Sequence, residues 1–307
     1  MSQLQKVIIM GLLLGTSFPI SKFAIAALGV WPFRLISSLS ALLGLLVMFR
    51  REVRQFLSST MDFRGIRTLV MLAVPNIFLV PTLNNFALSL TSASNAVILV
   101  YMMPALLSVI QMVAARRARI DSICAALLSV GGIALLLKST VIGAGEIVIL
   151  VSATVWAFGT FFAGRVGLQF PPAITTTVQY MTSFTLVVIC FMLMPGERTG
   201  AITAPPSTLV AAIGLAIYVG FIANAIVFHF WFTLIREKGA EFVAYSSLIS
   251  LVVGTLISVI VLSEPASSTL LASLLLIVAS VYIVQCRKQP ARAPLPVAAR
   301  VLEDGAH

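Results

Sequence analysis

Residues 209–234 read LVAAIGLAIYVGFIANAIVFHFWFTL, an uninterrupted apolar stretch without a single Asp, Glu, Lys or Arg. A helix needs about 20 such residues to cross the hydrocarbon core of a bilayer, so this stretch predicts a membrane-spanning helix. The whole chain agrees, because 60% of its 307 residues are hydrophobic and only 10% are charged. A soluble domain carries about 25% charged residues, so this chain has too little polar surface to cover itself in water.

Ten apolar runs of this kind predict an all-α integral membrane protein with ten transmembrane helices. The first five runs are 7–28, 32–49, 68–89, 92–114 and 120–137, and the second five are 147–164, 173–194, 209–234, 241–262 and 268–286. The expected organisation is a first five-helix repeat over 1–140, a second over 141–286, and a disordered cytoplasmic tail over 287–307. The tail is rich in proline and has too few apolar residues to build a core.

The basic residues follow this topology. With the N-terminus inside, sixteen of the 20 Lys and Arg residues fall on the inner side, and only Lys138 and Arg198 fall on the outer side. This asymmetry is the positive-inside pattern of multi-pass proteins. It predicts an inner-membrane protein with both termini in the cytoplasm, and it explains the net charge of +10 without a nucleic-acid partner.

The two halves resemble each other weakly. At an offset of 147 residues, 93–118 falls on 240–265. Separately, Gly15-Thr16 in the first run resembles Gly159-Thr160 in the sixth. Because five is odd, the second half must insert with the opposite orientation. The sequence therefore predicts two inverted repeats, a recurring architecture of secondary transporters.

Several short motifs carry a family resemblance over about residues 7–286. Residues 91–104 (TSASNAVILVYMMP) resemble the signature between the third and fourth helices of the drug/metabolite transporter superfamily, EamA-type. Residues 15–22 (GTSFPISK) resemble its first-helix motif, and Phe33-Arg34 resembles the pair that opens its second helix. Residues 238–247 and 262–265 (LSEP) resemble the matching pieces of the second repeat.

This resemblance implies ten helices in two inverted repeats, a central cavity, alternating access, and substrates that range over amino acids, other metabolites and drugs. The chain departs from the family pattern at three positions. Arg117 stands where the first repeat often has Glu, Leu251 where the ninth helix often has Pro, and Leu14 where Trp is usual. These departures leave the expected fold intact but do not allow a substrate to be transferred.

Polar groups within spans are costly in hydrocarbon and are candidates for function. The candidate substrate-binding residues are Lys22, Asn84, Asn85, Asn95, Tyr101, Trp156, Asn224, His229 and Tyr245. The candidate kink residues are Pro19, Pro75 and Pro104, since proline lacks the N–H that a helix interior requires.

Five of these candidates have a structural interpretation beside the functional one. Lys22 follows Pro19 by less than one turn and is placed to hold a carboxylate or phosphate, or else to extend to the outer interface. His229 titrates near neutral pH in water and is a candidate for proton coupling, or else a residue that bridges helices. The amides of Asn84, Asn85 and Asn95 either line a cavity or connect neighbouring helices.

The function that fits best is a secondary transporter that exports a small metabolite, an amino acid or another zwitterionic or anionic compound. No Asp or Glu lies in the middle of a span, which argues against a cationic substrate. The alternatives are a membrane-embedded enzyme acting on a lipid or isoprenoid phosphate, and a membrane scaffold. The sequence contains no catalytic or metal-binding motif, so no cofactor is expected. The expected partners are a small-molecule substrate and the lipid bilayer, with the chain a monomer or homodimer.

Overall fold

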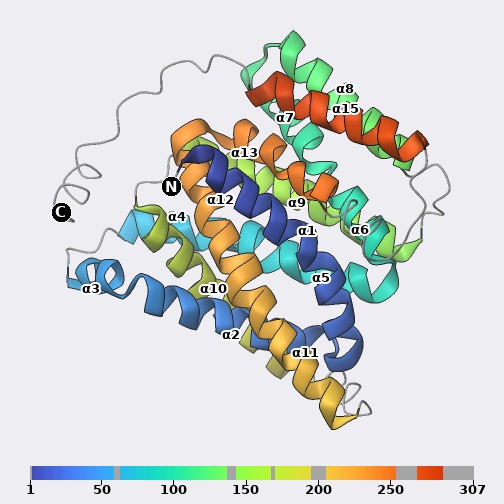
Figure 1. The fold of residues 1–307 in the computed structure, drawn as a ribbon. Helices are drawn as coiled ribbons and strands as arrows, with labels where there is room; N and C mark the ends of the chain where they lie inside the picture. The colour runs from blue at the N-terminus through green and yellow to red at the C-terminus, as the bar shows by residue number, and fades with distance from the viewer. Residues whose placement is uncertain are drawn as a thin grey trace.

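The computed structural model describes residues 2–58, 63–136, 143–166, 170–194, 205–253 and 268–285. Helices are the only regular elements within these ranges (Figure 1). Those before the gap at 137–142, here called the first half, are α1 Gln3–Leu28, α2 Val30–Met48, α3 Arg50–Ser58, α4 Phe63–Ala73, η1 Val74–Leu79, α5 Val80–Leu90, α6 Ala93–Val100, α7 Met103–Ala115 and α8 Ile120–Leu136. Those after it, the second half, are α9 Ala144–Val166, α10 Pro172–Leu193, α11 Pro206–Tyr218, η3 Val219–Ile226, α12 Val227–Lys238, α13 Ala240–Ser247 and α15 Ser268–Gln285.

Seven helical segments within the described residues have the length and apolar composition to cross a membrane. They comprise α1, α2, α4–η1–α5, α6–α7, α9, α10 and α11–η3–α12, and three shorter apolar helices accompany them at 120–135, 240–253 and 275–284. Each of the ten predicted runs overlaps one of these segments, and the last part of the ninth run, 254–262, lies outside the described residues. The prediction of an all-α, multi-pass membrane protein is therefore confirmed. The predicted tail, 287–307, lies outside the described residues.

Helices of the two halves pack against each other in matching pairs. α1 packs against α11 and η3, while α9 packs against α5 and η1. α2 packs against α10, and α8 packs against α15, which lie side by side in Figure 1. Among the described residues, the charged ones buried in the core are Arg34 of α2 and Glu146 of α9, which are 3% and 5% exposed.

The third span of each half contains a stretch of π-helix. η1 interrupts the first of these spans and η3 interrupts the second. Pro75, a predicted kink, is one of the first residues of η1, where its missing N–H frees a carbonyl from the regular ladder. η3 contains no proline and was not anticipated. π-helical turns of this kind occur frequently at functional sites.

The other two predicted kinks differ from each other. Pro19 lies inside α1, which continues as one helix from Gln3 to Leu28. Pro104 lies in the first turn of α7, directly after a turn at Tyr101 and Met102 that separates α7 from α6. A corresponding turn at Leu248 ends α13, 147 residues after Tyr101. The interruption thus recurs at the offset that relates the two halves in sequence.

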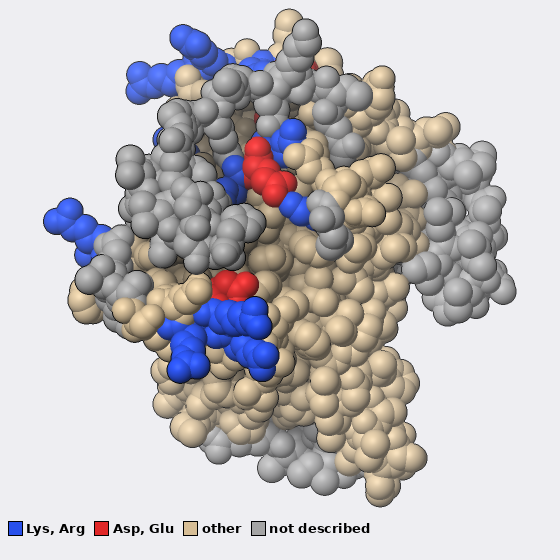
Figure 2. All heavy atoms as spheres, turned by 60° about the vertical axis from the view of Figure 1, so that its left-hand side comes forward, with Lys and Arg blue, Asp and Glu red and all other residues tan. Residues whose placement is uncertain are grey.

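One helix, α3, was not predicted. Its basic residues Arg50, Arg51 and Arg54 are exposed, whereas Val53 and Phe56 pack against a small apolar cluster that includes Leu69 and Phe170. The helix is amphipathic and too short to span a bilayer, so an apolar run of membrane length does not mark it in the sequence. In Figure 2 the visible Lys and Arg side chains lie over the left half of the face, with Asp and Glu side chains among them, and the described surface at the lower right is uncharged.

Candidate functional site

A cavity lies between the two halves, and both halves contribute to its wall. About 50 Å³ of it is open to the centre of a water molecule, which is room for a few waters. Helices α1 and α5 form the side from the first half, and η3, α12 and α9 form the side from the second. The lining residues are Leu14, Ser17, Phe18, Ser21, Val80, Pro81, Asn84, Asn85, Leu88, Tyr101, Trp156, Val219, Asn224 and Phe228.

The helical repeat explains the wall contributed by the first half. Leu14, Ser17, Phe18 and Ser21 of α1 are spaced i, i+3, i+4, i+7, which places them on one face of the helix. Pro81, Asn84, Asn85 and Leu88 of α5 have the same spacing. Each face therefore presents two polar residues between apolar ones. This spacing is the signal by which Ser17, Phe18 and Ser21 could have been identified from the sequence.

Five of the nine predicted site residues line the cavity: Asn84, Asn85, Tyr101, Trp156 and Asn224. They come from four separate elements and from both halves of the chain. The structure adds two serines and two phenylalanines, Ser17, Ser21, Phe18 and Phe228, that the prediction missed.

Some polar groups in this wall already make hydrogen bonds within the protein. The Asn84 side-chain carbonyl accepts a hydrogen bond of 2.6 Å from the Ser152 hydroxyl, and the Tyr101 hydroxyl accepts one from Ser250. The Ser17 hydroxyl donates to the Leu14 carbonyl at 2.8 Å. These bonds hold the wall in place across α1, α5 and α9 and the start of α7.

Other polar groups in the wall have no partner. The indole N–H of Trp156 is buried and donates to no group of the described residues, although the side chain is only 4% exposed. The amides of Asn85 and Asn224 and the hydroxyl of Ser21 likewise make no hydrogen bond with a described residue. A buried polar group without a partner costs free energy, and these groups are free to form hydrogen bonds with a molecule in the cavity.

Lys22 does not line the cavity. Its ammonium group donates to the backbone carbonyl of Thr91 at 2.8 Å and to that of Leu88. These carbonyls lie at the C-terminal end of α5, where a helix leaves its last carbonyls without intrahelical donors. Lys22 therefore joins the end of α5 to α1, a role that neither sequence reading included.

Two other predicted residues, His229 and Tyr245, also lie outside the cavity wall. The His229 ring lies 4.6 Å from the Phe49 ring, and the Tyr245 hydroxyl lies 3.0 Å from the Ser108 hydroxyl. The side chain of Asn95 falls outside the described part of the structure.

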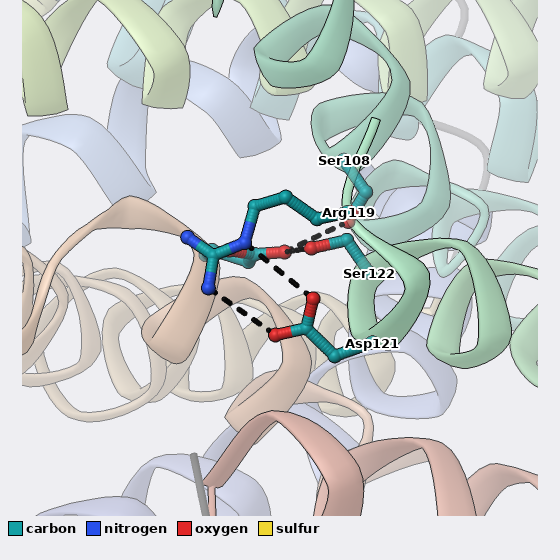
Figure 3. A network of polar contacts seen from close by, with 5 residues as sticks. Ser108, Arg119, Asp121 and Ser122 are labelled. Atoms are coloured by element: carbon teal, nitrogen blue, oxygen red, sulfur yellow. Dashed lines mark hydrogen bonds and ion pairs between the residues drawn. The ribbon is translucent and has the colours of Figure 1, made fainter. Parts of the chain in front are cut away.

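Tyr245 belongs to a polar cluster that connects α7, α8 and α13. The Glu241 carboxylate accepts a hydrogen bond from Ser122 at 2.7 Å and one from Ser108 at 3.4 Å. Figure 3 shows Ser108 and Ser122 in this cluster, beside the pair formed by Arg119 and Asp121 at 3.3 Å. The carboxylate thus fastens the start of α13 to both neighbouring helices.

Two charged residues buried in the core, Arg34 and Glu146, also make hydrogen bonds to neighbouring helices or loops. The Arg34 guanidinium donates to the Ile77 carbonyl at 3.1 Å and to the Ser183 hydroxyl at 3.4 Å. The Glu146 carboxylate accepts from the Thr91 hydroxyl and, at 3.0 Å, from the backbone N–H of Gly143. Within the described residues, no three His, Cys, Asp or Glu side chains come close enough to hold a metal ion.

Comparison with known proteins agrees with this architecture. The family model of the EamA-like transporter family matches the chain twice, over residues 3–138 and again over 143–286. No curated protein is significantly similar to the chain in sequence. Among 26 matching chains of solved structures, one crystal structure aligns with a TM-score of 0.63 over 90% of this chain and 96% of its own, at 17% identity. That likeness shows a shared fold.

The two matches cover nearly the whole described chain and fall on its two halves. Members of this family are transporters, which excludes the alternative of an enzyme acting on a lipid phosphate. The chain belongs to the EamA-like transporter family and is a multi-pass membrane transporter.

Proposed function

We propose that this chain is a secondary transporter that exports a small metabolite by alternating access through the cavity between its halves. The observation that carries the proposal is the wall itself, in which partnerless neutral donors and acceptors from both halves face one space. A solute held between two bodies can be exposed to either side when those bodies rock against each other.

The proposed architecture is ten spans in two inverted five-helix repeats, 1–140 and 141–286, followed by a tail at 287–307. Three features support it: the two family matches, the matching helix pairs across the halves, and the π-helices in the third span of each half. The positive-inside pattern supports an inner-membrane location with both termini in the cytoplasm.

Buried polar atoms beyond the cavity support a second conformation. The Trp231 indole, which stacks on Trp156 at 4.9 Å, donates its N–H to no described residue. The Thr160 hydroxyl, the Gln179 amide and the Asn76 side-chain carbonyl are also buried and find no partner in the described part of the chain. Such groups are satisfied when water reaches them, and polar groups in membranes line water-filled spaces. We infer that these groups mark a solute path between α9, α10, α12 and η1. The path is closed in this conformation and fills with water in a second conformation that is open on that side.

Counterflow in proteoliposomes tests the proposal. Vesicles containing the purified chain are loaded with an unlabelled mixture of amino acids, organic acids and uncharged metabolites, and the entry of each labelled compound is followed with and without a pH gradient. Saturable exchange of one compound, absent from protein-free vesicles, is the expected result, and the gradient reports proton coupling. Folded protein that exchanges none of the compounds would contradict the proposed function.

A further inference from the structure

The wall of the cavity contains no charged side chain among its described residues. The nearby basic residues of α1 and α2 are not among the lining residues. Lys22 binds two carbonyls, and Arg34 binds a carbonyl and a hydroxyl, while its buried Nε–H makes no hydrogen bond with a described residue. The buried acid of α9, Glu146, accepts hydrogen bonds from Thr91 and Gly143. A solute in this cavity therefore meets only neutral groups.

This neutrality restricts the charge of the solute. Moving a carboxylate or ammonium group from water into an apolar site costs on the order of several kcal/mol per ion unless an opposite charge pairs with it. An uncharged polar group costs far less, and a hydrogen bond compensates for it. The expectation of a zwitterionic or anionic substrate rested on Lys22, and the contacts of Lys22 remove that support.

The unused groups describe the solute further. The Trp156 N–H is a donor only, whereas the amides of Asn85 and Asn224 each offer both donors and an acceptor. Phe18 and Phe228 supply an apolar surface in the same wall. Given the proposed transport function, we infer that the solute is an uncharged molecule with an amide-like or hydroxyl-bearing edge and an apolar ring or chain.

A matched series built on one side chain tests this inference. At about pH 6, where the binding is measured, N-acetylphenylalaninamide is uncharged, phenylalanine is a zwitterion, phenylalaninamide is a cation and N-acetylphenylalanine is an anion. Binding of each probe to the purified full chain is measured from the rise in its unfolding temperature. We expect the uncharged probe to bind about tenfold more tightly than any charged one. Tighter binding of a charged probe, or no binding of any of the four, would overturn the inference.

A variant that adds one charge sharpens the test. Asn224→Asp places a carboxylate in the wall with almost no change in shape, so the preference should shift about tenfold toward phenylalaninamide. Gln55→Glu adds the same charge on the exposed helix α3 and should leave the order of the probes unchanged. Equal effects of the two variants would contradict the assignment.

The counterflow assay separates this inference from the transport proposal. Saturable exchange of a charged metabolite alone would overturn the uncharged-solute inference and leave the transport function in place. Exchange of no compound would overturn the transport function itself.

Discussion

The third spans of the two halves use the same backbone device for different purposes. In the first half the π-helix η1 carries Asn76, which is fully buried, donates to the Leu72 carbonyl at 3.0 Å and packs against Gly159. In the second half the π-helix η3 carries Asn224, which lines the cavity and binds no described residue. The π-helix thus contributes to helix packing in one half and to the cavity wall in the other. Two halves of similar fold can therefore build an asymmetric site.

The largest expected effect concerns the packing of η3. A Cβ on Gly220 would lie 2.0 Å from the Ser37 carbonyl oxygen and 2.2 Å from the Ser40 hydroxyl. Because the first of these is backbone, the helices must separate, so Gly220→Ala should cost about 3 kcal/mol of stability. The unfolding temperature in detergent measures this. Gly214→Ala, where nothing lies within 4 Å of the added carbon, is the control and should be neutral or slightly stabilising. Equal stability of the two variants would contradict the close approach.

The next effect distinguishes the two asparagines. Asn224→Ala should raise the half-saturating solute concentration in counterflow by about tenfold, which corresponds to the loss of one hydrogen bond to the solute. Asn76→Ala should instead lower stability by about 1 kcal/mol through the void it leaves, with an unchanged half-saturating concentration. If both variants altered solute affinity equally, the difference between η1 and η3 would be lost.

A smaller effect is expected where the third span of the first half ends. Lys22→Met removes two charged hydrogen bonds from the last carbonyls of α5, so stability should fall by about 1 kcal/mol. Solute affinity in counterflow should stay the same. A severe loss of affinity in stable protein would instead restore Lys22 as a solute-binding residue.

The smallest effect is expected where the third span of the second half ends. Glu237, near the end of α12, pairs with Lys6 of α1 at 2.6 Å, and its side chain is 36% exposed. Glu237→Gln should therefore cost about 0.5 kcal/mol in dilute buffer and nothing in high salt, because exposed ion pairs are weak and screened. Unfolding temperatures at two salt concentrations measure this. A salt-independent loss would point to packing rather than charge.

The sequence predicts the spans well because each apolar run of membrane length has one physical meaning. Pro75 also predicts the position of η1 correctly, since proline lacks the N–H that the hydrogen-bond pattern of an α-helix requires. η3 has no proline to mark it, and the close packing of its Gly220 on α2 is a long-range contact that a single sequence does not reveal. α3 was not predicted because it lies on the surface of the bundle and has no apolar run of membrane length.

The site was predicted in part for similar reasons. Polar residues within spans are few, so Asn84, Asn85, Tyr101, Trp156 and Asn224 could be selected by type alone. Whether such a residue faces the cavity depends on its neighbours. Backbone carbonyls form no sequence pattern, so the partners of Lys22 could not be foreseen, and a cation beside a proline looked like a solute site.

Chemical labelling inside the cavity tests most directly the claim that the solute passes between the halves. Ser21 lines the cavity, whereas Val47 of α2 is exposed on the outside of the bundle. In a chain whose three cysteines are replaced by alanine, Ser21→Cys and Val47→Cys are labelled to completion with a small thiol reagent, and counterflow of the exchanged solute is measured. The account predicts that labelling at position 21 abolishes exchange, that excess solute slows this labelling, and that labelling at position 47 has no effect. Full exchange by protein labelled at position 21 would contradict it.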